Sequence, residues 1–245
     1  MQIMKHDLFD RKPDAVILDL DNTLYAYEPS HRAAMAAARQ RACQALGILP
    51  TDFDAAFELA RKDVKKGLGP TASSHSRLLY FQRMIERLGM RTQVSLTLDL
   101  EQTYWRTFLL EVRLRPGAVD FLMDLRAMGI TTSILTDLTA QIQFRKIVFL
   151  GLESLLDYVV TSEETRGDKE TLHPFQLIRE KLGLDEGARI WMVGDDHCDL
   201  KASEALGAAT LFLKTEGRDH GAADAHFTDF NDLRRFVEQW DSSVK

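Results

Sequence analysis

The chain has 245 residues, 45% of them hydrophobic and 28% charged, with a formal net charge of -6 at pH 7. This composition is ordinary for a soluble globular protein, and the interspersed acidic and basic residues argue against a nucleic-acid-binding protein. No apolar run approaches the roughly 20 residues that span a bilayer, and no apolar leader segment follows the N-terminus, so we expect a cytoplasmic protein without a membrane partner.

The first clear element is a buried parallel strand at residues 15–18, an apolar run that stops abruptly at Asp19. The next stretch contains no convincing strand, and its apolar spacing predicts helices instead. Thr51, with Asp54 three residues later, resembles a cap for the second helix. The β-branched residues of 92–97 indicate a loop or an extended segment. The predicted helices span 31–46, 51–66, 77–88 and 98–111.

Strands and helices alternate in the rest of the chain. We predict strands at 132–135, 158–160, 190–193 and 210–213, and helices at 118–128, 141–150, 174–182 and 200–206. The alternation predicts an α/β fold, a Rossmann-like, doubly wound parallel sheet with helices on both faces. The length also favours a core domain that carries an insertion. We therefore assign residues 1–27 and 114–245 to the core and residues 28–113 to an inserted, all-helical, four-helix domain.

Polar side chains follow several of the predicted strands directly. Ligands bind at the carboxyl ends of the strands in such a sheet, so these side chains should converge. Carboxylates this close repel one another unless a cation lies among them, and an all-oxygen set favours Mg²⁺ over zinc. The residues are Asp19 and Asp21 after the first strand, Thr136 and Asp137 after the second, and Asp195, Asp196 and Asp199 after the fourth.

A metal held by acids, with a threonine and a lysine nearby, suits phosphate chemistry. The metal lets a carboxylate approach an anionic phosphoryl group, the hydroxyl donates to its oxygens, and the lysine offsets charge in the transition state. The carboxylate can then attack phosphorus and form an aspartyl phosphate.

The run Asp19-Leu20-Asp21-Asn22-Thr23-Leu24 after an apolar strand resembles the first motif of the haloacid dehalogenase (HAD) superfamily. Three further signals follow in the order of that family: Thr136 at a strand end, Lys169, and Gly194-Asp195 followed by Asp199. The inserted helices resemble the C1 cap of its subfamily I. The resemblance implies a Mg²⁺-dependent phosphatase that hydrolyses a small phosphorylated metabolite, such as a sugar phosphate, a nucleotide or flavin mononucleotide.

The resemblance also implies roles for individual residues. Asp19 would be the nucleophile and a metal ligand. Asp21 would protonate the leaving oxygen, later activate water, and bind the metal through its backbone carbonyl. The other implied roles are metal ligation for Asp195, phosphate binding for Thr136 and orientation of Asp19 for Lys169. Beyond the resemblance, we expect phosphate binding by Thr23 and Asp137, substrate contact by Arg77, and support of the site from behind by Asp196 or Asp199. The spacing leaves open which of the last two is the second acid of the motif.

Three other functions are compatible with parts of this pattern. A sugar phosphomutase of the same superfamily would share the site and differ mainly in excluding water. A 2-haloacid dehalogenase uses one aspartate and needs no second acid two residues later, so Asp21 argues against it. A receiver-like phospho-acceptor domain, which is not an enzyme, would lack the helical insertion after its first strand.

Overall fold

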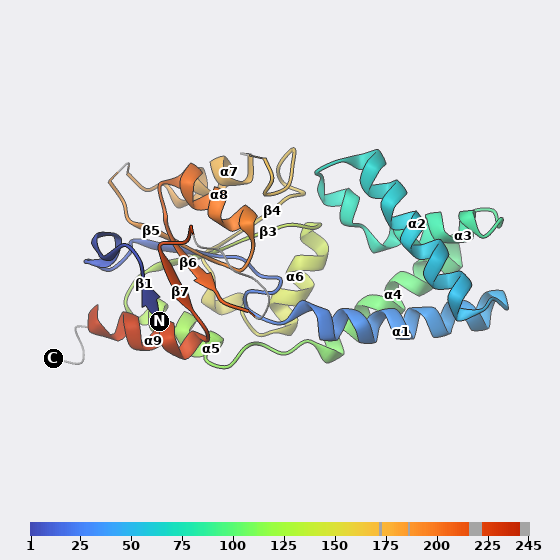
Figure 1. Ribbon diagram of the computed structural model, residues 1–245, viewed down its shortest axis with the longest axis horizontal. Helices are drawn as coiled ribbons and strands as arrows, with labels where there is room; N and C mark the ends of the chain where they lie inside the picture. The colour runs from blue at the N-terminus through green and yellow to red at the C-terminus, as the bar shows by residue number, and fades with distance from the viewer. Residues whose placement is uncertain (172, 186, 216–221, 241–245) are drawn as a thin grey trace. The chain divides into compact units, whose positions relative to one another are not determined.

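The computed structural model describes residues 1–171, 173–185, 187–215 and 222–240. By its internal contacts the chain separates into two compact units (Figure 1). The first unit combines Met1–Ala26 with Arg113–Lys245, and the second is Tyr27–Val112.

Strands of the described residues in the first unit form one seven-stranded sheet in the order β1-β7-β6-β5-β2-β3-β4. Neighbouring strands are parallel except for β1 and β7, which pair antiparallel at one edge. The predicted parallel sheet is confirmed, but β1 and β7 were not predicted, because strands this short show no periodicity. The strands are β1 Gln2–Ile3, β2 Ala15–Leu18, β3 Thr131–Thr136, β4 Tyr158–Thr161, β5 Ile190–Gly194, β6 Ala209–Leu213 and β7 Ala225–Phe227.

The central strand β2 determines where the site lies. It is fully buried and pairs with β3 on one side and β5 on the other, with Leu18 opposite both Ile134 and Val193. From β2 the chain proceeds outward through β3 and β4, then returns to the other side with β5, so the strand order reverses at β2. The carboxyl ends of β2, β3 and β5 therefore meet at one rim, where such sheets bind ligands.

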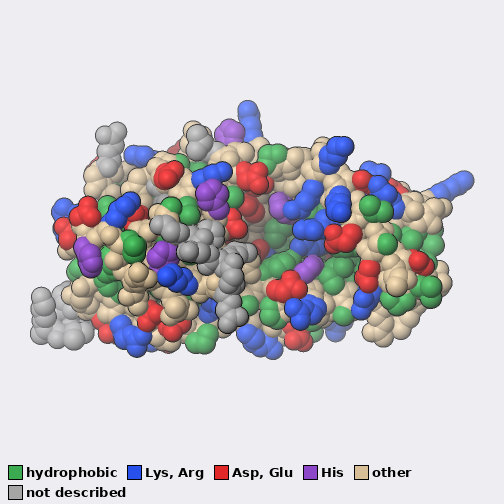
Figure 2. All heavy atoms as spheres, viewed as in Figure 1, with side chains coloured by type: hydrophobic (Ala, Val, Ile, Leu, Met, Phe, Trp, Pro, Cys, Tyr) green, Lys and Arg blue, Asp and Glu red, His purple; other side chains and the backbone are tan. Residues whose placement is uncertain are grey.

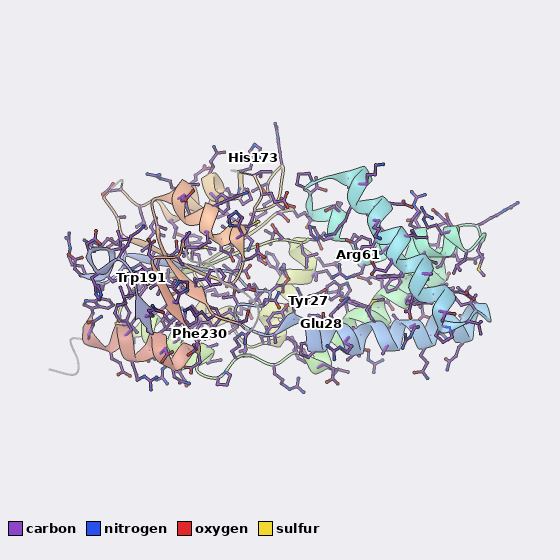
Figure 3. All side chains as sticks on the ribbon, viewed as in Figure 1. Tyr27, Glu28, Arg61, His173, Trp191 and Phe230 are labelled. Atoms are coloured by element: carbon purple, nitrogen blue, oxygen red, sulfur yellow. The ribbon has the colours of Figure 1, made fainter. Side chains whose placement is uncertain are left out.

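Helices cover both faces of this sheet, which confirms the doubly wound α/β fold (Figure 1). On one face, Phe175 and Ile178 of α7 pack on strand residues such as Ile17 and Met192. On the other, Trp191, labelled in Figure 3, contacts the rings of Phe9, Phe236 and Trp240. The helices of this unit are α5 Ala118–Ala127, α6 Ala140–Phe149, α7 His173–Leu182, α8 His197–Leu206 and α9 Phe230–Val237, with 3-10 turns at His6–Phe9, Glu153–Leu155 and Glu238–Trp240.

The second unit, which is described throughout, is entirely helical. α1 packs on α4 and α2 on α3. The buried residues Ala34, Ala38 and Ala42 recur every fourth position of α1, so small side chains allow its close approach to α4. The helices are α1 Tyr27–Leu46, α2 Pro50–Leu68, α3 Arg77–Arg87 and α4 Val94–Glu111, with a 3-10 turn at Ala72–His75.

Two local expectations for this unit were wrong. Thr51 does not cap α2, because Leu49 occupies the cap position and Pro50 starts the helix. Residues 94–97 are helical rather than extended. There Thr97 is buried and its hydroxyl donates to the carbonyl of Gln93 at 2.9 Å, so tertiary burial and a local hydrogen bond override the β-branched preference.

Acidic and basic side chains are intermingled on the face shown in Figure 2. Among the helices that the structure describes, none has the length and apolarity needed to cross a membrane.

Candidate active site

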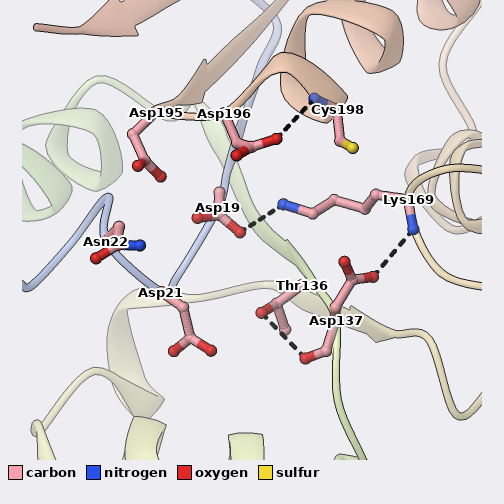
Figure 4. A pocket seen from close by; sticks show the side chains of 9 residues that line it. All are labelled: Asp19, Asp21, Asn22, Thr136, Asp137, Lys169, Asp195, Asp196 and Cys198. Atoms are coloured by element: carbon pink, nitrogen blue, oxygen red, sulfur yellow. Dashed lines mark hydrogen bonds and ion pairs between the residues drawn. The ribbon is translucent and has the colours of Figure 1, made fainter. Parts of the chain in front are cut away.

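A pocket of about 220 Å³ lies in the first unit at the rim formed by β2, β3 and β5 (Figure 4). The sequence predicted that polar residues after these strands would converge, and the pocket contains nearly all of them. Its lining consists of Asp19, Asp21, Asn22, Thr136, Asp137, Lys169, Asp195, Asp196 and Cys198.

Asp19 follows β2 directly and is 4% exposed. Its backbone N–H donates to the carbonyl of Val193 at 2.9 Å, which continues the ladder and fixes where the side chain emerges. One carboxylate oxygen, Oδ1, lies 2.6 Å from Lys169 Nζ, and the other, Oδ2, lies 3.0 Å from the Thr23 hydroxyl. Burial raises the pKa of Asp19 well above its ordinary value, and although Lys169 opposes this, the nearby Asp199 carboxylate adds to it.

Lys169 connects two buried carboxylates. Its Nζ lies 2.6 Å from Asp19 Oδ1 and 2.7 Å from Asp199 Oδ1, and the residue is only 6% exposed. Burial alone would lower the pKa of Lys169, but the two carboxylates outweigh it and raise the pKa well above the usual value. The lysine therefore stays charged, so it can hold Asp19 in one orientation.

An acidic cluster surrounds this ion pair. Asp19, Asp195 and Asp199 each offer one carboxylate oxygen, and these oxygens lie within 4.8 Å of one another. All three residues are buried, and the pKa of Asp19 is raised chiefly by its burial, with repulsion from the carboxylates of Asp199 and Asp195 adding to it. Three carboxylate oxygens at this spacing fit a hard divalent cation, which would offset that repulsion.

Asp196 and Asp199, the two candidates for the second acid of the motif, have different surroundings in the structure. Asp199 is fully buried, and its Oδ2 accepts the backbone N–H groups of Asp195 and Asp196 at 3.2 and 3.1 Å. Asp196 is exposed, and its Oδ1 accepts the backbone N–H of Cys198 at 3.1 Å in the first turn of α8. Asp199 thus organises the buried site, whereas Asp196 caps a helix.

Thr136 and Asp137 lie at the end of β3. Gln143 Nε2 donates to the Thr136 hydroxyl at 2.6 Å, and the backbone N–H of Lys169 donates to the Asp137 carboxylate at 3.0 Å. Burial raises the pKa of Asp137 to about 6 against the opposing effect of Lys169. The Thr136 hydroxyl is therefore placed at the pocket, while the Asp137 carboxylate holds the segment that carries Lys169.

Two other predicted phosphate contacts lie elsewhere. Thr23 does not line the pocket, because its buried hydroxyl lies between Asp19 Oδ2 at 3.0 Å and Asp195 Oδ1 at 3.2 Å. Arg77 belongs to the helical unit, where it donates to the His75 carbonyl at 2.7 Å and to the hydroxyl of Tyr27, labelled in Figure 3. Its guanidinium also lies 5.4 Å from the Tyr104 ring centroid, a cation-π contact.

Asp21 has partners that the sequence did not suggest. Lys146, on α6 and fully buried, places Nζ 2.7 Å from Asp21 Oδ1 and 2.9 Å from Oδ2. The Tyr25 hydroxyl also donates to Oδ1, and Gln143 Nε2 lies 3.4 Å from Oδ2. Burial raises the pKa of Asp21, but the Lys146 ammonium outweighs it, so the pKa is lowered overall. Apolar residues lie on both sides of α6, so the sequence alone did not mark Lys146 as buried.

Arg115 was also missed. Its guanidinium donates to the backbone carbonyls of Asn22 at 2.8 Å and Thr23 at 3.1 Å. Asn22 has a φ of 68°, in the left-handed region that asparagine tolerates better than most residues. Arg115 therefore holds the tight turn that separates the Asp21 side chain from Thr23.

Fold and pocket together place several carboxylates at the rim of a Rossmann-like sheet. Residues 13–207 match the model of the haloacid dehalogenase-like hydrolase family. The chain therefore belongs to the haloacid dehalogenase-like hydrolases, which confirms the resemblance seen in its motifs.

Individual relatives support this placement. The chain is 37% identical to a ribulose-1,5-bisphosphate 5-phosphatase of Halopiger xanaduensis over 86% of this chain and 91% of that protein. It is 26% identical to a glyceraldehyde 3-phosphate phosphatase of Methanocaldococcus jannaschii over 91% of this chain and 95% of that protein. In fold it resembles the crystal structure of a 2-haloacid dehalogenase from Pseudomonas syringae, with a TM-score of 0.74 and 20% identity over 94% of this chain and all of that one.

Proposed function

We propose that the chain is a Mg²⁺-dependent phosphatase that hydrolyses the monoester of a small phosphorylated sugar. The observation that carries the proposal is the buried Asp19, paired with Lys169 beside an acidic cluster, with a second aspartate two residues later. The two relatives named above are sugar-phosphate phosphatases by name, which favours sugar phosphates over nucleotides or flavin mononucleotide.

Asp19 is the proposed nucleophile. Its carboxylate oxygen forms a bond to phosphorus while the bond from phosphorus to the sugar oxygen breaks, and Asp21 gives its proton to that leaving oxygen. Asp21 then takes a proton from a water molecule that attacks the aspartyl phosphate, which releases phosphate and restores Asp19. Lys169 keeps Asp19 oriented, and the Thr136 hydroxyl donates to the phosphoryl oxygens.

The acidic cluster is the proposed metal site. Asp19, Asp195 and the backbone carbonyl of Asp21 would hold Mg²⁺, with Asp199 behind them. A bound Mg²⁺ supplies positive charge that lets a carboxylate and an anionic phosphoryl group approach each other. We further propose that residues 28–113 are the C1 cap of this family and that Arg77 is its substrate-contacting residue.

The test is turnover of p-nitrophenyl phosphate with and without Mg²⁺, followed by a panel of sugar phosphates, nucleotides and flavin mononucleotide ranked by kcat/KM. The panel includes ribulose 1,5-bisphosphate and glyceraldehyde 3-phosphate. We expect release of inorganic phosphate only with metal, and the highest kcat/KM on a sugar phosphate. Hydrolysis that proceeds equally with a chelator present would refute the mechanism. A product that keeps its phosphate at a new position would instead identify a phosphomutase.

The roles of Asp196 and Asp199 can be tested with one pair of variants. Asp199→Asn should lower kcat about 10- to 100-fold, the usual effect of losing a group that orients a ligand. Asp196→Ala should leave kcat within about threefold and cost about 1 kcal/mol of stability through the lost helix cap. Both are measured by steady-state kinetics and thermal unfolding. A larger kinetic loss for Asp196→Ala would reverse the assignment.

A further inference from the structure

Lys146 is a buried cation that the proposed roles leave unused. It is fully buried within the first unit, where an unpaired ammonium would cost several kcal/mol. Its Nζ lies 2.7 and 2.9 Å from the two carboxylate oxygens of Asp21. The charge of the lysine is therefore offset by that carboxylate.

The buried face of α6 combines polar and apolar side chains. Lys146 and Gln143 are both fully buried, whereas Phe144 is 47% and Val148 59% exposed on the same helix. Ile142 and Ile147 are buried on that face too, so α6 buries two polar side chains beside two apolar ones. This rotation brings the two polar groups to the rim, Gln143 to Thr136 and Lys146 to Asp21.

Asp21 is held from two directions. Arg115 fixes the backbone of the turn after it, through the carbonyls of Asn22 and Thr23. The side chain of Asp21, by contrast, is contacted by Lys146, Tyr25 and Gln143. In Figure 4 the carboxylate of Asp21 points away from Asp19. Of these three contacts, Lys146 is the charged one and reaches both carboxylate oxygens, so it holds the carboxylate most strongly.

We propose that Lys146 is a positioning residue that sets the orientation of the Asp21 carboxylate for its work on the leaving oxygen. Because Nζ contacts both carboxylate oxygens, one of them can turn toward the pocket while the other stays bound to the lysine. The inference rests on the proposed phosphatase function, in which Asp21 carries the proton. It adds to that function a residue that acts through the side chain of Asp21.

The first experiment compares Lys146→Met with wild type on two substrates, a sugar phosphate and p-nitrophenyl phosphate. The quantity measured is kcat/KM, which covers the steps through the breaking of the substrate's phosphate ester. We expect a loss of about 10- to 100-fold for the sugar phosphate, whose alkoxide leaving group needs a well-placed proton donor. The loss should be only a few-fold for the aryl phosphate, which leaves without that help. KM should change little for either substrate.

Lys181→Met is the matched control. Lys181 lies in the same unit and makes an ion pair with Glu164 at 2.6 Å, but this pair is partly exposed and lies outside the pocket. This variant should keep both kcat/KM values within about twofold of wild type. Lys146→Arg, which keeps the charge, should recover part of the loss on the sugar phosphate.

A double-mutant cycle separates positioning from general stability. Asp21→Asn removes the partner, so adding Lys146→Met to it should lower kcat/KM on p-nitrophenyl phosphate by less than about twofold. The double variant contains no unpaired buried charge, so it remains informative if Lys146→Met alone does not fold. Equal losses on both substrates, unchanged activity, or a further large loss in the double variant would overturn the proposal. An inactive wild type would instead overturn the phosphatase function itself.

Discussion

Replacing Asp19 with asparagine should lower kcat for phosphate-ester hydrolysis by at least about a thousand-fold, the scale seen when a nucleophile is removed. The amide has nearly the same shape and keeps an oxygen for the Thr23 hydroxyl, 3.0 Å away in the wild type. What it loses is the oxygen that can attack phosphorus. Lys169 retains Asp199 as a charged partner at 2.7 Å, so the buried lysine is not left without a counter-charge.

The same substitution makes a separate prediction about stability. Burial raises the pKa of Asp19, and the neighbouring carboxylates of Asp199 and Asp195 add to this, so removing its negative charge removes a desolvation cost and relieves repulsion in the metal-free protein. We expect the Tm of Asp19→Asn without metal to equal or exceed that of wild type, and its stabilisation by Mg²⁺ to be smaller. Thermal unfolding with and without Mg²⁺ measures both effects.

Asp185→Asn, at an exposed position of the same unit, is the control for the loss of a carboxylate. It should match wild type in kcat and in its response to Mg²⁺. An Asp19→Asn variant with a kcat within tenfold of wild type would rule out Asp19 as the nucleophile, provided that the variant does not deamidate during the assay.

The strands that could be predicted from the sequence are those buried on both faces of the sheet. β2 is fully buried, so it appears in the sequence as an uninterrupted apolar run at residues 15–18. Because that run ends where the sheet ends, the sequence also predicted that Asp19 would stand at the rim. The strands β1 and β7 were not predicted. They are stabilised by pairing with each other at the edge of the sheet, with Gln2 opposite His226, and segments of two or three residues are too short to show a strand pattern in the sequence.

The helix α6 shows why the site could be predicted only in part. Hydrophobic spacing locates the helix, but its apolar residues lie on both sides: Ile142 and Ile147 are buried, whereas Phe144 and Val148 are exposed. The spacing alone therefore does not say whether Lys146 is buried. In the structure it is buried, and the contacts of this face with Asp21 and Thr136 are specific to this pocket. Asp21 itself was placed correctly, but its charged partner lies 125 positions away in sequence, and one sequence does not reveal such a pair.

Gly194→Ala should damage both the stability and the activity of the protein. Gly194 ends β5, and a Cβ added there would lie 2.3 Å from Asp199 Oδ2 and 2.4 Å from its Cγ. Asp199 cannot move aside cheaply, because its Oδ2 accepts two backbone N–H groups and its Oδ1 holds Lys169. We expect a stability loss of about 1 to 3 kcal/mol, the range for overpacking a buried site. Displacement of Lys169 should also lower kcat at least about tenfold.

A second glycine provides the control, and a double variant tests the cause. A Cβ at Gly187 meets nothing within 4 Å, so Gly187→Ala should leave Tm and kcat close to wild type. If the clash with Asp199 is the cause, Gly194→Ala combined with Asp199→Ala should be about as stable as Asp199→Ala alone, because the second substitution removes the atoms that the new methyl group meets. Additive losses would show instead that the methyl group disturbs β5 itself. The glycine before Asp195 would then be needed for the strand rather than for the carboxylate that supports Lys169.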